Sequence, residues 1–369
     1  MSTLATAQGT ARYAERFSGT AAPGHFRDAQ KLKISSLGIG TYLGQPDDKV
    51  DASYAASVVA SVESGINVID TAINYRFQRS ERCIGSALTQ LAQKSFARDE
   101  FILCTKGGYL TPDGSMPSDP NEYFYREYIQ PGIFKPDEIV QGSHCMTPRF
   151  LENQLGRSLR NLGVDSIDVY YLHNPETQLS EVSRPDFMER IRDAFICLES
   201  AAAKGKIQFY GLATWNGFRL DAAARESLQL GEIEQLARDI AGEAHRFRFV
   251  QLPFNLAMTE ALTLGNQMIA GEAKTVMEAA SELGVNLIAS ASLLQGQVAR
   301  NLPPFVAQAL GLRSDAERAL QFVRSSPGIT TALVGMSHPE HVTTNAHLVG
   351  VQPATVDEFS KLFSRGETA

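Results

Sequence analysis

The sequence predicts an α/β protein in which eight parallel strands close into a (β/α)8 barrel. From residue 31 onward, short runs of β-branched and apolar residues alternate with longer segments of helical periodicity, which is typical of repeated βαβ units. Eight such units can be counted, and right-handed crossovers between eight parallel strands favour closure into a TIM-type barrel. One barrel domain can accommodate a chain of 369 residues.

The predicted strands are almost continuously apolar, as expected for strands that are buried on both faces. They span residues 37–41, 67–71, 101–105, 167–172, 208–213, 249–252, 286–290 and 331–335. The predicted helices span residues 52–64, 79–93, 148–162, 186–204, 221–240, 260–283, 304–325 and 339–348. Thr147 and Pro148 mark the start of one helix, and Gly163 and Gly284 stand where two helices should end.

Two segments depart from this regular alternation. Residues 1–30 are rich in small residues, and we expect them to form an N-terminal arm that is loosely held or disordered. Residues 31–369 are expected to form one domain with a loop insertion at about 107–146, where no helical period is evident. This insertion follows the third strand, at the end of a barrel where active sites are built, which favours a substrate lid over a merely solvated loop.

Composition narrows the class of protein. With 43% hydrophobic and 20% charged residues and a net charge of −7, the chain is typical of a globular protein and does not favour nucleic acid as a partner. No apolar run is long enough to span a bilayer. The four cysteines are far apart, which favours a reducing cytoplasm over a disulfide scaffold; they are Cys83, Cys104, Cys145 and Cys197. We expect a monomer or weak homo-oligomer that binds small molecules.

Four side chains with chemical potential follow the predicted strands. Asp70 ends the second strand and Tyr75 lies in the loop after it, while Lys106 and His173 follow the third and fourth strands. In a barrel these positions converge at one mouth. Carbonyl reduction needs a proton donor for the oxygen that gains charge, and a tyrosine can donate if a lysine nearby lowers its pKa from about 10. The expected roles are therefore Tyr75 as general acid, Lys106 as its activator, Asp70 as the partner of Lys106, and His173 as the group that orients the carbonyl.

Several segments together resemble the aldo-keto reductase family. The segments are Ile69-Asp-Thr-Ala-Ile-Asn-Tyr75, Thr105-Lys106, residues 155–175, and Val334-Gly335-Met336-Ser337 through Asn345, in the family's order across residues 31–350. The resemblance implies a TIM barrel, NADPH as the usual cofactor with no metal or flavin, and a catalytic tetrad that falls on Asp70, Tyr75, Lys106 and His173.

The resemblance also implies a set of residues that line the dinucleotide. Gln251 would bind the nicotinamide amide. The family often stacks a tyrosine on the nicotinamide after the seventh strand, where this chain offers only Ser290, and many members carry a basic residue where this chain has His341. NADPH is still favoured, with NADH as the alternative. The full set is Thr41, Tyr42, Asp70, Thr214, Gln251, Ser290, Leu293, Gly335, Met336, Ser337, His341 and Asn345.

Loop residues at the expected mouth form a candidate substrate pocket. They are Tyr42, Phe77, Tyr109, His144, Trp215 and Asn216. An aromatic rim favours an apolar or ring-bearing carbonyl over a small sugar, although these side chains have the alternative role of packing the insertion against the barrel.

The sequence thus predicts an NAD(P)H-dependent oxidoreductase that acts on an aldehyde or ketone, or on an alcohol in reverse. The main alternative is a non-catalytic NAD(P)H-binding barrel that acts as a sensor or accessory subunit. A metal-dependent barrel enzyme is not favoured, because no cluster of strand-end ligands is evident. A Rossmann domain is not favoured either, since Gly38, Gly40 and Gly44 give GxGxxxG in place of GxGxxG.

Overall fold

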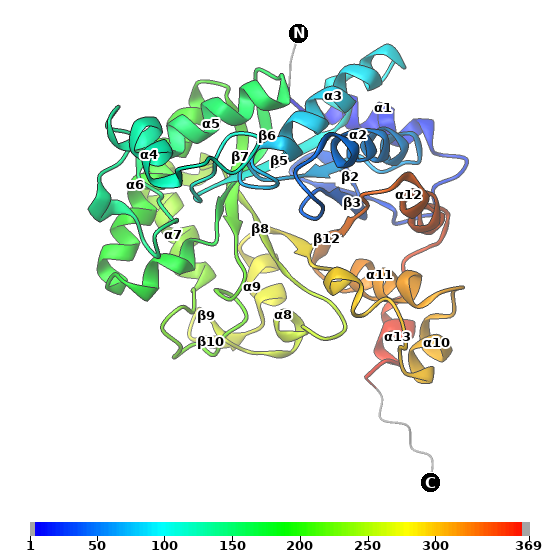
Figure 1. Ribbon diagram of the computed structural model, residues 1–369. Helices are drawn as coiled ribbons and strands as arrows, with labels where there is room; N and C mark the ends of the chain where they lie inside the picture. The colour runs from blue at the N-terminus through cyan, green and yellow to red at the C-terminus, as the bar shows by residue number, and fades with distance from the viewer. Residues whose placement is uncertain (1–3, 364–369) are drawn as a thin grey trace.

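Eight parallel strands close into a barrel in the computed structural model, which describes residues 4–363 (Figure 1). The strands pair in the order β11-β12-β3-β4-β5-β6-β7-β8. Every predicted strand is confirmed, with ends that differ from the prediction by two residues or fewer. Their bounds are β3 Leu37–Gly40, β4 Val68–Asp70, β5 Ile102–Gly107, β6 Ile167–His173, β7 Ile207–Ala213, β8 Phe247–Pro253, β11 Asn286–Ser290 and β12 Ile329–Gly335.

Helices surround the barrel, as Figure 1 shows, and their inner faces share one apolar core with the strands. Local sequence sets their ends: Asp47 caps α2 by accepting a hydrogen bond from Val50 N–H, and Gly163 ends α5 with a φ of 65°. The main outer helices are α2 Asp48–Glu63, α3 Arg79–Gln93, α5 Pro148–Leu162, α6 Arg184–Ala203, α7 Leu230–Ala241, α9 Val276–Glu282, α11 Asp315–Ser325 and α12 Pro339–Ala346.

Two predicted helices are shorter than expected. The helix expected at 221–240 begins only at Leu230, because Asp221 forms a local turn in which its side chain accepts from Ala223 N–H. The helix expected at 304–325 divides into α10, Pro304–Leu310, and α11. Gly311 and Leu312 both have positive φ there, and Ser314 starts the second helix with a capping box. A further short helix, α13, spans Val356–Ser360.

The prediction of one helix over 260–283 was wrong. The segment forms a short helix α8, Glu260–Thr263, then a hairpin of β9, Gln267–Ile269, and β10, Glu272–Lys274, before α9. Ala270 and Gly271 join the two strands with φ values of 52° and 85°. Two consecutive residues of positive φ give the turn that matches the twist of a two-residue hairpin, and this turn overrides the helical pattern.

Residues 4–30 are packed against the barrel, which corrects the expectation of a loosely held arm; residues 1–3 lie outside the described residues. Helix α1, Ala7–Arg16, is followed by a hairpin of β1, Phe26–Ala29, and β2, Leu32–Ser35. Tyr13 is fully buried, and its hydroxyl donates to Val62 O at 2.6 Å. Arg12 pairs with buried Glu100 at 2.8 Å, and Ala5 N–H donates to buried Asp168. The arm therefore covers the N-terminal end of the barrel strands.

Because the Tyr13 side chain is buried between the arm and the barrel, Tyr13→Ala should lower the free energy of unfolding by roughly 3–5 kcal/mol. Urea unfolding followed by circular dichroism measures the effect. Glu15→Ala is the matched control, since Glu15 is exposed on the same helix and should change stability by no more than about 0.5 kcal/mol. Equal stability of the two variants would mean that the arm does not stabilise the barrel.

The segment between β5 and α5 has more structure than the loop expected at 107–146. It contains α4, Pro120–Phe124, a π-helical turn, Tyr125–Ile129, and a 3-10 turn, Pro136–Glu138. Tyr128, Phe134 and Cys145 bury their side chains with Phe150 of α5 in a small core of their own. The segment thus has a packed interior, and its two stems, at Tyr109 and His144, are joined by an antiparallel bridge. That it is an insertion remains a prediction.

Candidate active site

Two of the predicted catalytic side chains form a buried ion pair at the C-terminal ends of neighbouring strands. Asp70 ends β4, Lys106 lies near the end of β5, and the Lys106 ammonium is 2.6 Å from the Asp70 carboxylate. Lys106 Nζ also donates to Thr71 O at 2.7 Å. Gln251 on β8 donates to the second carboxylate oxygen of Asp70 at 2.8 Å. Both Asp70 oxygens therefore have partners, and Lys106 is held in one position.

Tyr75 and His173 complete the group. Lys106 Nζ is 5.0 Å from the centre of the Tyr75 ring, and the Tyr75 and His173 rings are 5.8 Å apart at a steep angle. Tyr75 and His173 are both partly exposed, whereas Lys106 is buried beneath them. The fold therefore brings all four residues of the predicted tetrad together at one end of the barrel.

The charge state of the site follows from its burial. Burial lowers the Lys106 pKa, but the charge and hydrogen bond of Asp70, together with Tyr75, raise it, and the net pKa lies above the usual value, so Lys106 stays protonated. Burial, with the Lys106 ammonium adding to it, holds the His173 pKa well below its usual value of 6.5, so His173 is a neutral imidazole at physiological pH. Burial raises the pKa of Tyr75, and Lys106 opposes this shift without cancelling it. The expected net lowering of the Tyr75 pKa is therefore not found in the protein alone.

A left-handed turn follows Tyr75, and sequence reasoning missed it. Arg76, Phe77 and Gln78 have φ values of 50°, 56° and 69°, a conformation that costs energy for residues other than glycine. Arg76 stabilises the turn: its buried guanidinium donates to Gln45 O at 3.0 Å and forms an ion pair with Asp51. Since Gln45 lies on the loop that carries Tyr42, Arg76 ties that loop to Tyr75. No motif in the sequence marks this role.

The predicted pocket residues divide into two groups. Tyr42 and Trp215 are 57% and 44% exposed, and the Tyr42 ring lies 5.0 Å from that of Tyr75. Glu176 holds the Trp215 loop, because one of its oxygens accepts from the main-chain N–H groups of residues 215 and 216 at 2.6 and 2.9 Å. His144 does not belong at the mouth: it is buried behind His173, which corrects its assignment to the substrate pocket. The partly exposed members are Phe77, Tyr109 and Asn216.

Comparison with known proteins decides the family. The sequence model described as "Aldo/keto reductase family" matches residues 36–364. The chain belongs to this family. Members are NAD(P)H-dependent oxidoreductases, and the fold and convergent tetrad described above agree with that assignment.

Individual relatives of this aldo/keto reductase are distant. It is 26% identical over 341 residues to a D-threo-aldose 1-dehydrogenase of Pseudomonas sp, a match that covers 88% of this chain and 92% of the relative. It is 22% identical to a putative voltage-gated potassium channel subunit beta of Schizosaccharomyces pombe, covering 89% and 88%.

Solved structures show the same fold. An aldo/keto reductase from Klebsiella pneumoniae in complex with NADP and acetate gives a TM-score of 0.61 at 19% identity, covering 94% of this chain and 98% of that one. A glycerol dehydrogenase from Gluconobacter oxydans gives 0.63 at 19% identity, covering 92% and 94%.

The residues assigned to the dinucleotide lie on one arc of the reductase barrel. Apart from Asp70 on β4, they lie on or after β7, β8, β11, β12 and β3, which are consecutive around the barrel, whereas the tetrad comes from β4, the loop after it, β5 and β6. Thr214 after β7 is buried, and its hydroxyl has no hydrogen-bond partner among the described residues. An added Cβ at Gly335 would meet no atom within 4 Å. The Thr214 hydroxyl, unpartnered among residues 4–363, and the free space at Gly335 fit a dinucleotide bound along this arc.

Other assigned residues differ in what they offer. The Thr41 hydroxyl donates a hydrogen bond to Thr71 Oγ1 at 2.9 Å, and the Met336 side chain is buried in the core. Neither side-chain group therefore faces outward. Gln251 is engaged by Asp70. His341 is exposed on α12, 5.5 Å from the ring of His338. Ser290, Leu293 and Ser337 are partly buried, and Asn345 is buried.

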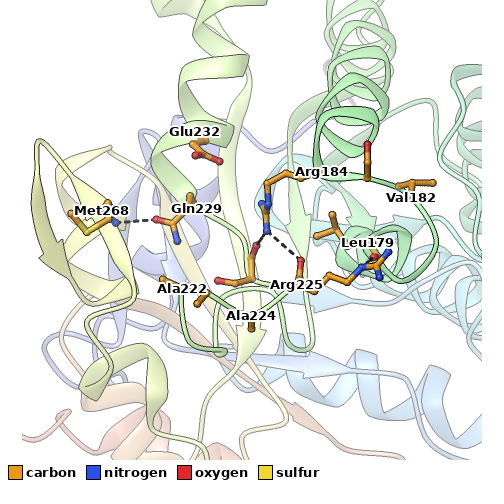
Figure 2. Close-up of a pocket in the computed structure, with 12 residues that line it drawn as sticks. Leu179, Val182, Arg184, Ala222, Ala224, Arg225, Gln229, Glu232 and Met268 are labelled. Carbon is orange, nitrogen blue, oxygen red and sulfur yellow. Dashed lines mark hydrogen bonds between the residues drawn. The ribbon is translucent and has the colours of Figure 1, made fainter.

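A cavity elsewhere does not contribute to this site. A cavity of about 580 Å³ lies beside the start of α6, where Arg184 donates to the main-chain oxygens of residues 225 and 227 (Figure 2). No predicted site residue lines it, so the chemistry is assigned to the barrel mouth. Among residues 4–363, no group of His, Cys, Asp or Glu is arranged to hold a metal ion. Within the same range, no helix is both long and apolar enough to cross a membrane.

Proposed function

We propose that the protein reduces an aldehyde or ketone with NADPH, with Tyr75 as the general acid. The observation that carries this proposal is the convergence of Tyr75, Lys106 and His173 at the barrel mouth, with Asp70 holding Lys106 charged. The reduced nicotinamide supplies the hydride when it is bound. The remaining work, which is to orient the carbonyl and protonate its oxygen, falls to these side chains.

The neutral His173 imidazole and the Tyr75 hydroxyl both donate hydrogen bonds to the carbonyl oxygen in this proposal. As that oxygen gains negative charge, Tyr75 transfers its proton to it. Loss of this proton converts Tyr75 to a phenolate, which the nearby Lys106 ammonium stabilises. Asp70 does not transfer a proton; it keeps Lys106 protonated and in place. In the reverse direction, the Tyr75 phenolate accepts the proton of an alcohol.

We infer the substrate class from the exposed rings at the barrel mouth. The exposed rings of Tyr42 and Trp215 favour a substrate with an apolar or ring-shaped surface. The names of relatives include an aldose dehydrogenase and a 6-dehydroglucose reductase, both of which concern a carbonyl or hydroxyl carbon. A cytoplasmic location and a monomeric or weakly associating state are further predictions from the sequence.

The preference between NADPH and NADH offers a separate test. Helix α12 begins after His338, and its first turn carries no arginine or lysine to pair with a 2′-phosphate. We therefore expect His341→Arg to tighten NADPH binding about tenfold, equivalent to about 1.4 kcal/mol, and to leave NADH binding nearly unchanged. Fluorescence titration of each variant with both cofactors measures the effect.

Thr343→Arg is the matched control for this prediction. Thr343 is exposed on the same helix, but two helical positions from His341 and therefore on another face. The same gain in NADPH affinity in both variants would indicate a general charge effect. It would remove the assignment of His341 to the 2′-phosphate.

A non-catalytic role as a sensor or accessory subunit is the alternative. The likeness to a putative potassium channel subunit beta favours it. The presence of all four side chains needed for reduction favours catalysis, and turnover of a carbonyl substrate separates the two functions.

A further inference from the structure

The two stems of the 107–146 segment meet directly beside His173. Tyr109 and His144 face each other in an antiparallel bridge, and Cys145 N–H donates to Gly108 O at 2.8 Å. The fit is close at Gly108, which has a φ of 145°: an added Cβ would lie 3.0 Å from His173 O and 3.1 Å from His144 Nε2. The stems are therefore packed against the main chain of His173 with no room for a larger residue at position 108.

His144 forms a hydrogen bond to the main chain of His173. Its Nε2 is 2.8 Å from His173 O and donates to it, while Gln178 Nε2 donates to His144 Nδ1 at 2.7 Å. This pattern defines a neutral imidazole with its proton on Nε2. Gln178 is itself fixed, because its carbonyl oxygen accepts from Arg190. Arg190, Gln178 and His144 thus form a hydrogen-bonded chain that ends at the main-chain oxygen of His173.

Tyr109 contacts the side chain of His173. Its ring lies 5.1 Å from the His173 ring at 90° and 4.9 Å from the His144 ring at 79°, so it packs edge-to-face against both histidines. Its hydroxyl is 3.2 Å from Asn174 Nδ2 and 3.3 Å from Thr177 Oγ1. Both of these residues follow β6, so the Tyr109 ring is held against the strand end that carries His173.

His173 depends on these contacts for its orientation. Its Nδ1 is buried and has no hydrogen-bond partner among residues 4–363. A functional histidine is commonly oriented by a hydrogen bond from one ring nitrogen to a carboxylate or carbonyl, and His173 lacks that support at Nδ1. The His173 ring is therefore oriented by packing against Tyr109 and Tyr75 and by its own main chain, which His144 holds in place.

We propose that Tyr109 and His144, together called the Tyr109–His144 brace, are positioning residues that set the orientation of His173 for carbonyl reduction. The inference rests on the proposed function, and it deepens that function by making the 107–146 segment a support of the catalytic group as well as a cover. It also explains why His144 is buried behind the site and does not line its mouth.

The test compares His144 with a second buried histidine. His25 is also fully buried, and its Nε2 lies 2.9 Å from Gly65 O, but it sits near the N-terminal end of β3, away from the mouth. Burial lowers the pKa of each to about 4, so both are neutral. The purified full chain is prepared as wild type, His144→Leu, His144→Gln and His25→Leu. Stability, NADPH affinity, kcat and KM for an aldehyde are measured for each.

We expect both leucine variants to lose stability, but only His144→Leu to lose kcat, by about tenfold or more, with NADPH affinity within about twofold of wild type. His144→Gln should recover most of this kcat, because its amide can donate to His173 O. An active wild type with equal kcat in the two leucine variants would overturn the brace. A wild type that binds NADPH but turns over no carbonyl would instead overturn the proposed function.

Substitutions at partly exposed Tyr109 provide a second test if His144→Leu does not fold. Tyr109→Phe keeps the ring against His173 and should retain more kcat than Tyr109→Leu, which removes the ring and should lower kcat by about tenfold. Equal kcat in these two variants would show that the ring contact does not position His173.

Discussion

Replacing Tyr75 by phenylalanine should lower kcat for aldehyde reduction by at least about a hundredfold, because it removes the proton donor and leaves the ring in place. NADPH affinity should stay close to that of wild type, since the Tyr75 hydroxyl faces the reacting oxygen in the proposed mechanism. Steady-state turnover and a fluorescence titration measure the two quantities on the same preparation.

Tyr125→Phe is the control for this substitution. Tyr125 is 55% exposed and begins the π-helical turn of the 107–146 segment, so loss of its hydroxyl should leave kcat unchanged. Turnover by Tyr75→Phe close to the wild-type value would contradict the role of Tyr75 as general acid.

The second large effect is expected for Lys106→Met. Lys106 is buried beside Asp70, so its removal leaves a buried carboxylate with Gln251 as its one side-chain partner among residues 4–363. The free energy of unfolding should fall by roughly 3–5 kcal/mol. Since the ammonium also opposes the rise of the Tyr75 pKa, kcat should fall by at least about a hundredfold.

A double variant separates stability from catalysis. Asp70→Asn combined with Lys106→Met removes both charges and should recover most of the lost stability, because neither charge is then left unpaired. Its kcat should remain as low as that of Lys106→Met. Recovery of activity together with stability would mean that Lys106 acts only by supporting the fold.

The convergence of Asp70, Lys106 and their two partners at one mouth was predictable from sequence because strand ends are predictable; their catalytic roles stay a prediction. An apolar run that stops at Asp70 or Lys106 places the next polar side chain at the C-terminal end of a parallel strand, and barrel closure brings such ends together. The helices α3 and α5 were predicted with the correct bounds because their periodicity and their end residues, such as Gly163, agree.

Features that depend on tertiary contacts were not predictable. The left-handed turn after Tyr75 exists because the Arg76 guanidinium is held by the loop that follows β3, a contact between segments about thirty residues apart. Likewise, His144 was assigned to the mouth because it lies at a stem of the 107–146 segment, but only the fold shows its bond to His173 O.

Burial in the fold also outweighs two features that the local sequence suggests. The net pKa of Tyr75 depends on how much burial outweighs the nearby ammonium, which sequence cannot specify. The N-terminal arm has a composition of small residues, yet Tyr13 anchors it in the core, because one large side chain in a matching site stabilises a short helix more than composition suggests.

Carbonyl reduction by this protein is measured by following the absorbance of NADPH with purified wild-type protein and a panel of aromatic and aliphatic aldehydes. We expect loss of the nicotinamide absorbance that depends on the aldehyde, with one alcohol formed for each NADPH oxidised. Tight NADPH binding without oxidation by any carbonyl would contradict catalysis and favour the sensor role, and no binding of NADPH or NADH would contradict the dinucleotide arc itself.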